Sequence, residues 1–181
     1  MTKWILKKRG VTQIEFLLIA LAVLLVIFSI IEFALYFYSI QMANEVTRRA
    51  ARLATVCYIA DRDDIPELPA VKGLYPPGFS SSDLKISYLT AEEDDDGNIK
   101  IEALTDAEVA EFSSASPTID LNEVFSHIRF VKAEADYEFK FFVLAALIKA
   151  VGVSPRFQTI LPAESLGVLR PEAGLGKHED C

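Results

Sequence analysis

The stretch that decides the fold is FLLIALAVLLVIFSIIEFALYFYSI, residues 16–40 of a 181-residue chain. From Phe16 to Ile31 only Ser29 interrupts the apolar side chains, and Glu32 is the first charged residue of the stretch. Twenty-five residues in an α-helix rise roughly 37 Å, which is enough to cross a bilayer. A helix is required because lipid offers the backbone no other hydrogen-bond partner. The sequence therefore predicts a membrane-spanning helix and excludes a plain soluble domain.

The flanking charges predict how this helix is oriented. The first ten residues contain no acid and four bases, Lys3, Lys7, Lys8 and Arg9. Such a bias predicts a cytoplasmic N-terminus and a single-pass inner-membrane protein whose remaining chain lies in the periplasm. A cleaved secretory signal is the rival interpretation. It fits poorly because the best cleavage point, Ala34, has Glu32 three positions before the cut, and because the apolar run is too long.

Directly before the span stands KKRGVTQIEF, residues 7–16. This segment resembles the processing site of type IV prepilins, in which a membrane peptidase cuts after the glycine and the fifth mature residue is an acid. The resemblance implies a cut after Gly10, with Val11 as the new N-terminus and Glu15 as the fifth residue. A residue without a side chain lets a protease approach the backbone closely.

Glu15 has two interpretations. A carboxylate near lipid is costly unless it is paired, and the resemblance implies that Glu15 meets the N-terminal amine of a neighbouring subunit in a pilus. Alternatively, Glu15 marks the interface end of an ordinary anchor and stabilises the N-terminus of its helix.

A second acid–phenylalanine pair stands late in the span. Glu32-Phe33 repeats the order of Glu15-Phe16, about 25 Å further along a helix. A segment with arginines follows, including Asn44, Arg48, Ala50, Ala51 and Arg52. Together these features resemble the TadE-like minor pilins, or pseudopilins, of the tight-adherence (Flp-type) pili. The resemblance covers residues 7–57 and is only architectural beyond them.

The resemblance implies a fold, a function and partners. The fold is α+β and type IV pilin-like, with a long hydrophobic spine helix and a small antiparallel-sheet head domain. The function is pilus initiation, assembly or tip formation in support of adhesion, because shaft subunits of this pilus type have almost no head. The implied partners are the prepilin peptidase, the major pilin, a second minor pilin, the inner-membrane assembly platform and the lipid bilayer. The chain is also expected to reach the extracellular pilus.

The helix is expected to continue past the membrane. Between Gln41 and Tyr58 there is no glycine or proline, and apolar residues recur three and four positions apart, at Ala43, Val46, Ala50, Leu53 and Cys57. The sequence thus predicts a leader over residues 1–10, a transmembrane spine helix over 11–60 and a periplasmic α+β head over 61–181.

Within the head, prolines and glycines predict that residues 61–83 form a connection without a regular helix. Alternating apolar residues predict a hairpin over 84–104 with a turn at Asp96-Gly97-Asn98. Residues 105–127 are expected to contain one or two short helices with Asp106 and Asp120 as N-caps.

The rest of the head is predicted to contain two more strands. Alternation over residues 128–141 predicts a long, half-buried antiparallel strand. An apolar, helical segment over 142–151 is too short to span a bilayer. A last strand is expected over 156–161.

Charge and side-chain chemistry exclude several functions. Residues 61–136 carry 18 acids and 6 bases, a net charge of −12, which argues against a nucleic-acid partner. Two histidines and two cysteines are too few for most metal or redox frameworks. We therefore expect no metal, no cofactor and no enzyme activity. Cys57 and Cys181 either form a disulfide, as a periplasmic location permits, or remain free thiols.

Two other functions remain open from the sequence. One is an uncut, signal-anchored periplasmic scaffold or binding domain, in which substitutions at Gly10 and Glu15 have little effect. The other is a pseudopilin of a type II secretion system, which shares the processing site and whose loss stops protein export rather than pilus formation.

Overall fold

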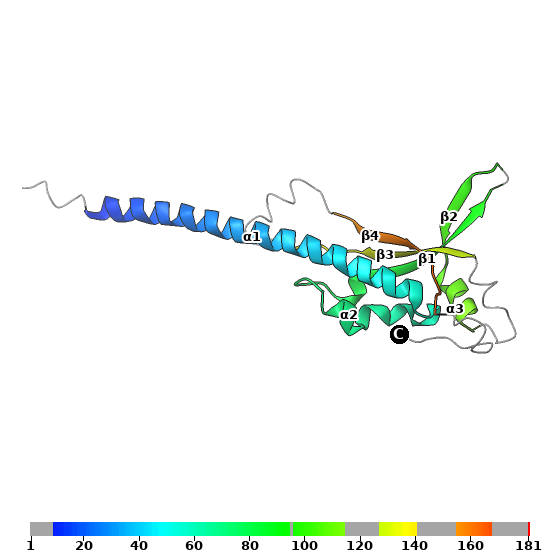
Figure 1. The fold of residues 1–181 in the computed structure, drawn as a ribbon. Helices are drawn as coiled ribbons and strands as arrows, with labels where there is room; N and C mark the ends of the chain where they lie inside the picture. The colour runs from blue at the N-terminus through cyan, green and yellow to red at the C-terminus, as the bar shows by residue number, and fades with distance from the viewer. Residues whose placement is uncertain (1–8, 95, 115–126, 141–154, 168–180) are drawn as a thin grey trace, which may run out of the picture. The chain divides into compact units, whose positions relative to one another are not determined.

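The computed structural model describes residues 9–94, 96–114, 127–140, 155–167 and 181. The chain divides into two compact units: residues 1–38 with 139–154, and residues 39–138 with 155–181. Helix α1 (Arg9–Val56) supplies residues to both units (Figure 1). It is followed by four strands, β1 (Leu84–Glu93), β2 (Ile99–Ala103), β3 (Ile128–Ala135) and β4 (Phe157–Pro162), and by helix α3 (Asp106–Ser114) between β2 and β3. The α+β class with a long N-terminal helix and a small antiparallel sheet is confirmed.

The four strands form one antiparallel sheet in the order β2-β1-β3-β4. The expected hairpin over residues 84–104 is confirmed as β1 and β2, and the last strand as β4. The strand expected over 128–141 ends earlier, at Ala135. Ala135 pairs with Leu84 on one side and Phe157 on the other, and these are the first residues of the two neighbouring strands. The alternation nevertheless continues to Tyr137, which is buried.

The C-terminal part of α1, from Ser39 onward, packs on one face of this sheet. Of the predicted apolar repeat, Ala43, Val46, Ala50 and Cys57 are buried as expected, whereas Leu53 is only partly buried and its neighbour Ala54 is fully buried instead. On the sheet, the buried face carries Ile86, Tyr88, Val131 and Ala133. The hydroxyl groups of Thr47 and Thr159 form a hydrogen bond of 3.1 Å between helix and sheet. Alanine side chains on the buried face of α1 leave room for the sheet to approach closely, and the buried apolar area stabilises the contact.

The prediction for residues 61–83 is wrong in one respect. This connection contains short 3₁₀ helices at Ile59–Asp63, Ile65–Glu67 and Ser81–Asp83 and the one-turn helix α2 (Pro69–Lys72). Pro66 and Pro69 lie in the first turns of their helices, where a missing N–H group breaks no helical hydrogen bond. Proline therefore shortens these helices without preventing them.

Aromatic packing orders the same connection. The ring centroids of Tyr75 and Phe79 lie 4.7 Å apart, and those of Phe79 and Tyr137 lie 5.4 Å apart. The Tyr75 hydroxyl donates to the carbonyl of Pro66 and the Tyr137 hydroxyl donates to that of Pro77, at 2.5 and 2.9 Å. Burial, together with nearby Glu67 and Asp83, raises the pKa of Tyr75 to about 12.

The N-cap of α3 is Thr105 rather than Asp106. The Thr105 hydroxyl accepts a hydrogen bond from the Glu108 backbone N–H at 3.3 Å, and the Glu108 carboxylate accepts one from the Thr105 N–H at 2.7 Å. This reciprocal pair is a capping box. Asp106 is the first residue of the helix instead and forms an ion pair with Arg62 at 3.1 Å. The second predicted cap, Asp120, and the helical segment expected over 142–151 lie outside the described residues.

Candidate functional site

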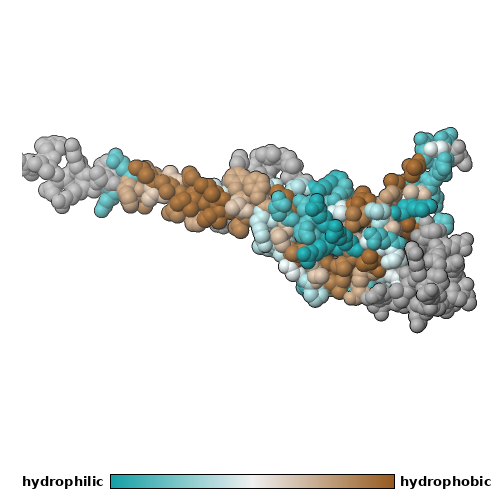
Figure 2. Space-filling view, in the orientation of Figure 1, coloured by the Kyte–Doolittle hydropathy of each residue, from teal (hydrophilic) through white to brown (hydrophobic). Residues whose placement is uncertain are grey.

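The first unit contains the exposed apolar half of α1. Within Gln13–Val56 the helix is long and apolar enough to cross a membrane, and none of its most apolar window is buried. Figure 2 shows the corresponding side chains as a brown surface along the helix. An exposed apolar surface of this length is not stable in water. Within the described part of the chain this is one such helix, near the N-terminus, and a head rich in charged residues follows it, which supports single-pass membrane anchoring.

The residues predicted for processing lie at the beginning of the helix. Because α1 begins at Arg9, Gly10 and Val11 belong to its first turn. Glu15 lies one turn after Val11 and its side chain is exposed. Phe16 is 73% exposed. A chain that begins at Val11 therefore carries a positive amine and a carboxylate one helical turn apart at the same end of an apolar helix.

Glu32 has a different environment from Glu15. Its side chain is only 8% exposed although its neighbours Ile31 and Phe33 are exposed, and it has a partner within the structure. Seventeen residues separate Glu32 from Glu15, which corresponds to about 25 Å along the helix and roughly 100° around it. The two acids are therefore not parts of one site.

Aromatic rings lie close together near the C-terminal end of the apolar stretch of α1. The Tyr36 ring meets Phe139 edge-on, with the centroids 5.8 Å apart, and Tyr36 also lies 5.7 Å from Phe37. In the second unit, α1 becomes polar on its exposed side. Arg49 there forms an ion pair with Glu45 at 3.3 Å and donates to the carbonyl of Ala70. This ion pair joins two side chains that lie one helical turn apart on the exposed side of α1.

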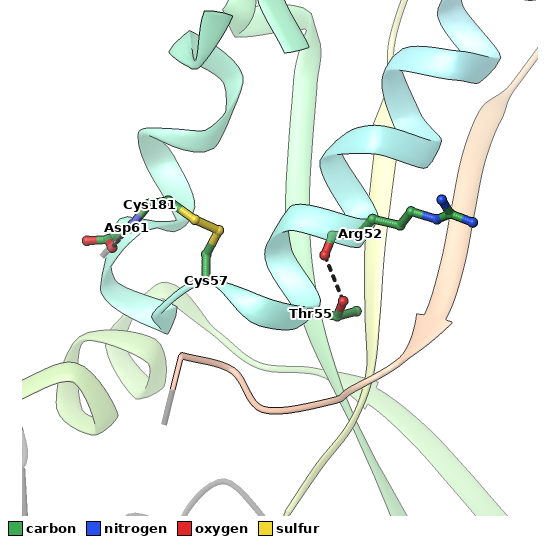
Figure 3. The surroundings of a disulfide bond; sticks show 5 residues. All are labelled: Arg52, Thr55, Cys57, Asp61 and Cys181. Atoms are coloured by element: carbon green, nitrogen blue, oxygen red, sulfur yellow. Dashed lines mark hydrogen bonds between the residues drawn. A yellow bond between two sulfur atoms is a disulfide. The ribbon is translucent and has the colours of Figure 1, made fainter. Parts of the chain in front are cut away.

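The structure contains a disulfide between Cys57 and Cys181, whose Cα atoms lie 5.5 Å apart (Figure 3). Cys57 is buried and directly follows α1. The backbone N–H of Cys181 donates to the Asp61 carboxylate at 3.3 Å. The disulfide links residues separated by 124 positions and attaches residue 181 to the point where α1 stops.

The end of α1 also has a contact that sequence reasoning missed. The Leu166 N–H donates to the Thr55 carbonyl at 3.0 Å, which satisfies one of the free carbonyls of the last helical turn. Leu166 is almost fully buried and has a φ of 47°, and Gly167 follows with a φ of 74°. Only the glycine signals this turn in the sequence, because nothing local shows that residue 166 meets residue 55.

Arg62 is a second residue whose role the sequence did not indicate. Its guanidinium group is mostly buried and forms ion pairs with Asp63 at 3.0 Å and Asp106 at 3.1 Å. The second pair connects the short helix after α1 to the N-terminus of α3. Arg62 therefore has a structural role within the head.

No group of three or more histidine, cysteine, aspartate or glutamate side chains within the described ranges is placed to hold a metal ion. The arrangement instead offers an apolar helical surface, an acid near its beginning and a folded head at its end.

Comparison with known proteins finds a family model that is similar to the first part of the chain. Residues 10–52 match the model of the TadE-like protein family. No curated protein and no solved structure matches the chain significantly.

Proposed function

Because this match supports a TadE-like protein of the Tad (Flp) pilus system, we propose that the chain is a minor pilin that is processed after Gly10. The match carries the proposal: it begins at Gly10 and includes Val11, Glu15, Phe16 and Glu32. The family is pilus-associated and structural rather than catalytic, and the anchoring helix agrees with such a function.

The physical chemistry of α1 fits a helix that serves first as an anchor and later as an assembly surface. In the precursor, lipid covers the exposed apolar side chains before Tyr38. In a filament, the same side chains pack against the helices of neighbouring subunits, so the apolar surface passes from one apolar environment to another. Hydrophobicity alone therefore opposes the transfer little.

Glu15 would set the position of the subunit in the filament. The peptidase cut creates an amine on Val11, and a carboxylate near lipid is stable only when it is paired. Pairing of Glu15 with the amine of a neighbour satisfies both charges and fixes the axial offset between two otherwise uniform apolar helices. Phe16 would pack in the same contact. Glu32, which is only 8% exposed, would remain as a polar group late in the membrane span.

The size of the head supports a proposal about the position of the protein in the pilus. Its sheet and short helices exceed what a shaft subunit of this pilus type carries, so we assign the chain to initiation, assembly or the tip. The implied partners are the prepilin peptidase, the major pilin, a second minor pilin and the assembly platform. The head would face the periplasm, and after assembly it would lie outside the cell, where it supports adhesion.

The experiment that tests the proposal is the intact mass of the protein purified from membranes of its native host. We expect a chain that begins at Val11 in cells with an active prepilin peptidase. Loss of residues 1–10 lowers the intact mass by the mass of ten residues, which is a large and unambiguous change. It also removes four bases and no acid. A chain that still begins at Met1 or Thr2 in such cells would contradict the proposal and favour an uncut, anchored domain.

The disulfide makes a separate prediction. We propose that Cys57 and Cys181 are bridged in the native protein, since the periplasm is oxidising. Alkylation of the denatured, unreduced protein should modify neither thiol, and prior reduction should expose both. Two reactive thiols without reduction would rule out the bridge. This outcome would leave the processing site untouched, because the bridge lies in the head.

A further inference from the structure

Strand β2 is an edge of the sheet and is exposed along its whole length. Ile99 is 73% exposed and Ile101 is 56% exposed. Figure 1 shows β2 and the end of β1 extending from the rest of the sheet as a hairpin. Among the described residues, β2 pairs with β1 alone. Its outer edge is therefore a row of backbone groups beside apolar side chains that face water, a combination that favours the addition of another strand.

The hydrogen-bond pattern shows which residues of β2 face this edge. The Leu104 N–H donates to the Tyr88 carbonyl at 2.9 Å, and the Asp94 N–H donates to the Asn98 carbonyl at 2.8 Å. Hydrogen-bonded pairs alternate along an antiparallel ladder, so Lys100 and Glu102 direct their backbone groups to β1. The backbone groups of the intervening residues, Ile99, Ile101 and Ala103, point outward.

The sequence of β2, Ile99-Lys100-Ile101-Glu102-Ala103, is complementary to itself when it is reversed. In an antiparallel pair centred on Ile101, Ile101 meets Ile101 of the second copy and Ile99 meets Ala103. These are the residues whose outward N–H and C=O groups are free to exchange hydrogen bonds. On the opposite face, Lys100 meets Glu102 of the second copy and Glu102 meets Lys100. Those positions are non-hydrogen-bonded in the new pair, where side chains approach each other most closely.

We propose that a second copy of this chain docks on β2 in this register, so that the two heads share one continuous eight-stranded sheet related by a two-fold axis at Ile101. Apolar pairs lie on one face of the junction and two ion pairs on the other, and such cross-strand pairs stabilise a sheet. The interface is isologous, because each subunit contributes the same strand. The proposal concerns the head alone and does not depend on processing after Gly10.

The other edge of the sheet lacks these properties and provides a control. Strand β4 contains no charged residue and ends in Pro162, which has no N–H group to donate. Ile160 is 50% exposed and lies on the same sheet face as Ile101. The register shows this, because Ile160 pairs with Lys132 and Lys132 pairs with Ser87 of β1. Alternate residues of β1 share a face, so this face continues from Ser87 through Leu89 to Ala91, which pairs with Ile101. A cysteine at residue 160 is therefore similarly exposed but lies at the wrong edge.

The first test is thiol cross-linking of the full chain in membranes. At a hydrogen-bonded antiparallel pair the two Cα atoms lie about 5.5 Å apart, within the range of a disulfide. We expect Ile101→Cys to form a covalent dimer of the chain under mild oxidation, several-fold more than Ile160→Cys or the unchanged protein. Equal dimer yields from Ile101→Cys and Ile160→Cys would overturn the proposal. Capture of a different protein by Ile101→Cys would also overturn it, because β2 would then serve another occupant.

The second test uses charge and separates pairing between chains from effects within one chain. Lys100 and Glu102 also form an ion pair within a single strand. Lys100→Glu alone places acids opposite acids across the junction, and Glu102→Lys alone places bases opposite bases. Each variant, carrying Ile101→Cys, should form several-fold less dimer, whereas an equal mixture of the two should form the mixed dimer. No rearrangement within one chain restores cross-linking in the mixture, so failure of the mixture to cross-link would overturn the register.

Discussion

Gly10→Leu is expected to leave the chain uncut, so that its intact mass includes residues 1–10 and cells that carry it lack pili. Cleavage requires the peptidase to place catalytic groups against the bond between Gly10 and Val11. A side chain at position 10 pushes that bond away, and a displacement of about 1 Å slows a reaction on the order of 100-fold. Gly10→Ala adds only a methyl group and should be cut more completely than Gly10→Leu.

A matched variant separates cutting from assembly. Glu15→Gln keeps the shape of the side chain and leaves the cleaved bond unchanged, but it removes the charge proposed to pair with a neighbour's amine. We expect a chain that begins at Val11, remains in the membrane and does not enter pili. The measurements are intact mass and the recovery of sheared pili from cells. Normal pilus assembly by an uncut Gly10→Leu chain would contradict the proposed pathway.

Much of α1 was predictable because its signal is local. A long run of apolar residues permits few structures, and the repeat of Ala43, Val46 and Ala50 identifies the face that packs on the sheet. The hairpin was predictable for the same reason: Asp96-Gly97-Asn98 separates two alternating segments, and Gly97 has the positive φ of 77° that such a turn needs.

The features missed by sequence reasoning depend on residues far apart in the chain. β3 ends where its antiparallel neighbours β1 and β4 begin, and the alternating pattern beyond Ala135 does not indicate this position. Thr105 caps α3 because Glu108 folds back onto it, while Asp106 pairs with Arg62 from an earlier helix. The free edge of β2 follows from strand order, which no local pattern determines.

Gly167 is the clearest case of a long-range requirement. An added Cβ would lie 2.5 Å from the backbone nitrogen of Tyr58, 2.6 Å from its Cα and 2.9 Å from its Cβ. Tyr58 stands directly after the buried Cys57, so its backbone has little freedom to move. The φ of 74° at Gly167 is also unfavourable for any residue with a side chain. Space and backbone conformation therefore both require glycine.

Gly167→Ala is accordingly expected to destabilise the head strongly. Strain at positive φ and overpacking each cost about 1–3 kcal/mol, so the sum is on the order of 4 kcal/mol and the Tm should fall by about 10 °C or more. Gly78→Ala and Gly97→Ala are matched controls, because both glycines also have a positive φ. An added Cβ would meet nothing within 4 Å at Gly78. At Gly97 it would meet only the Glu93 carboxylate, at 3.9 Å. Thermal unfolding of the full chain in detergent should show a clearly larger loss for Gly167→Ala than for either control. Equal losses would mean that residues 166 and 167 do not pack against the end of α1, and that the disulfide alone holds the C-terminal segment there.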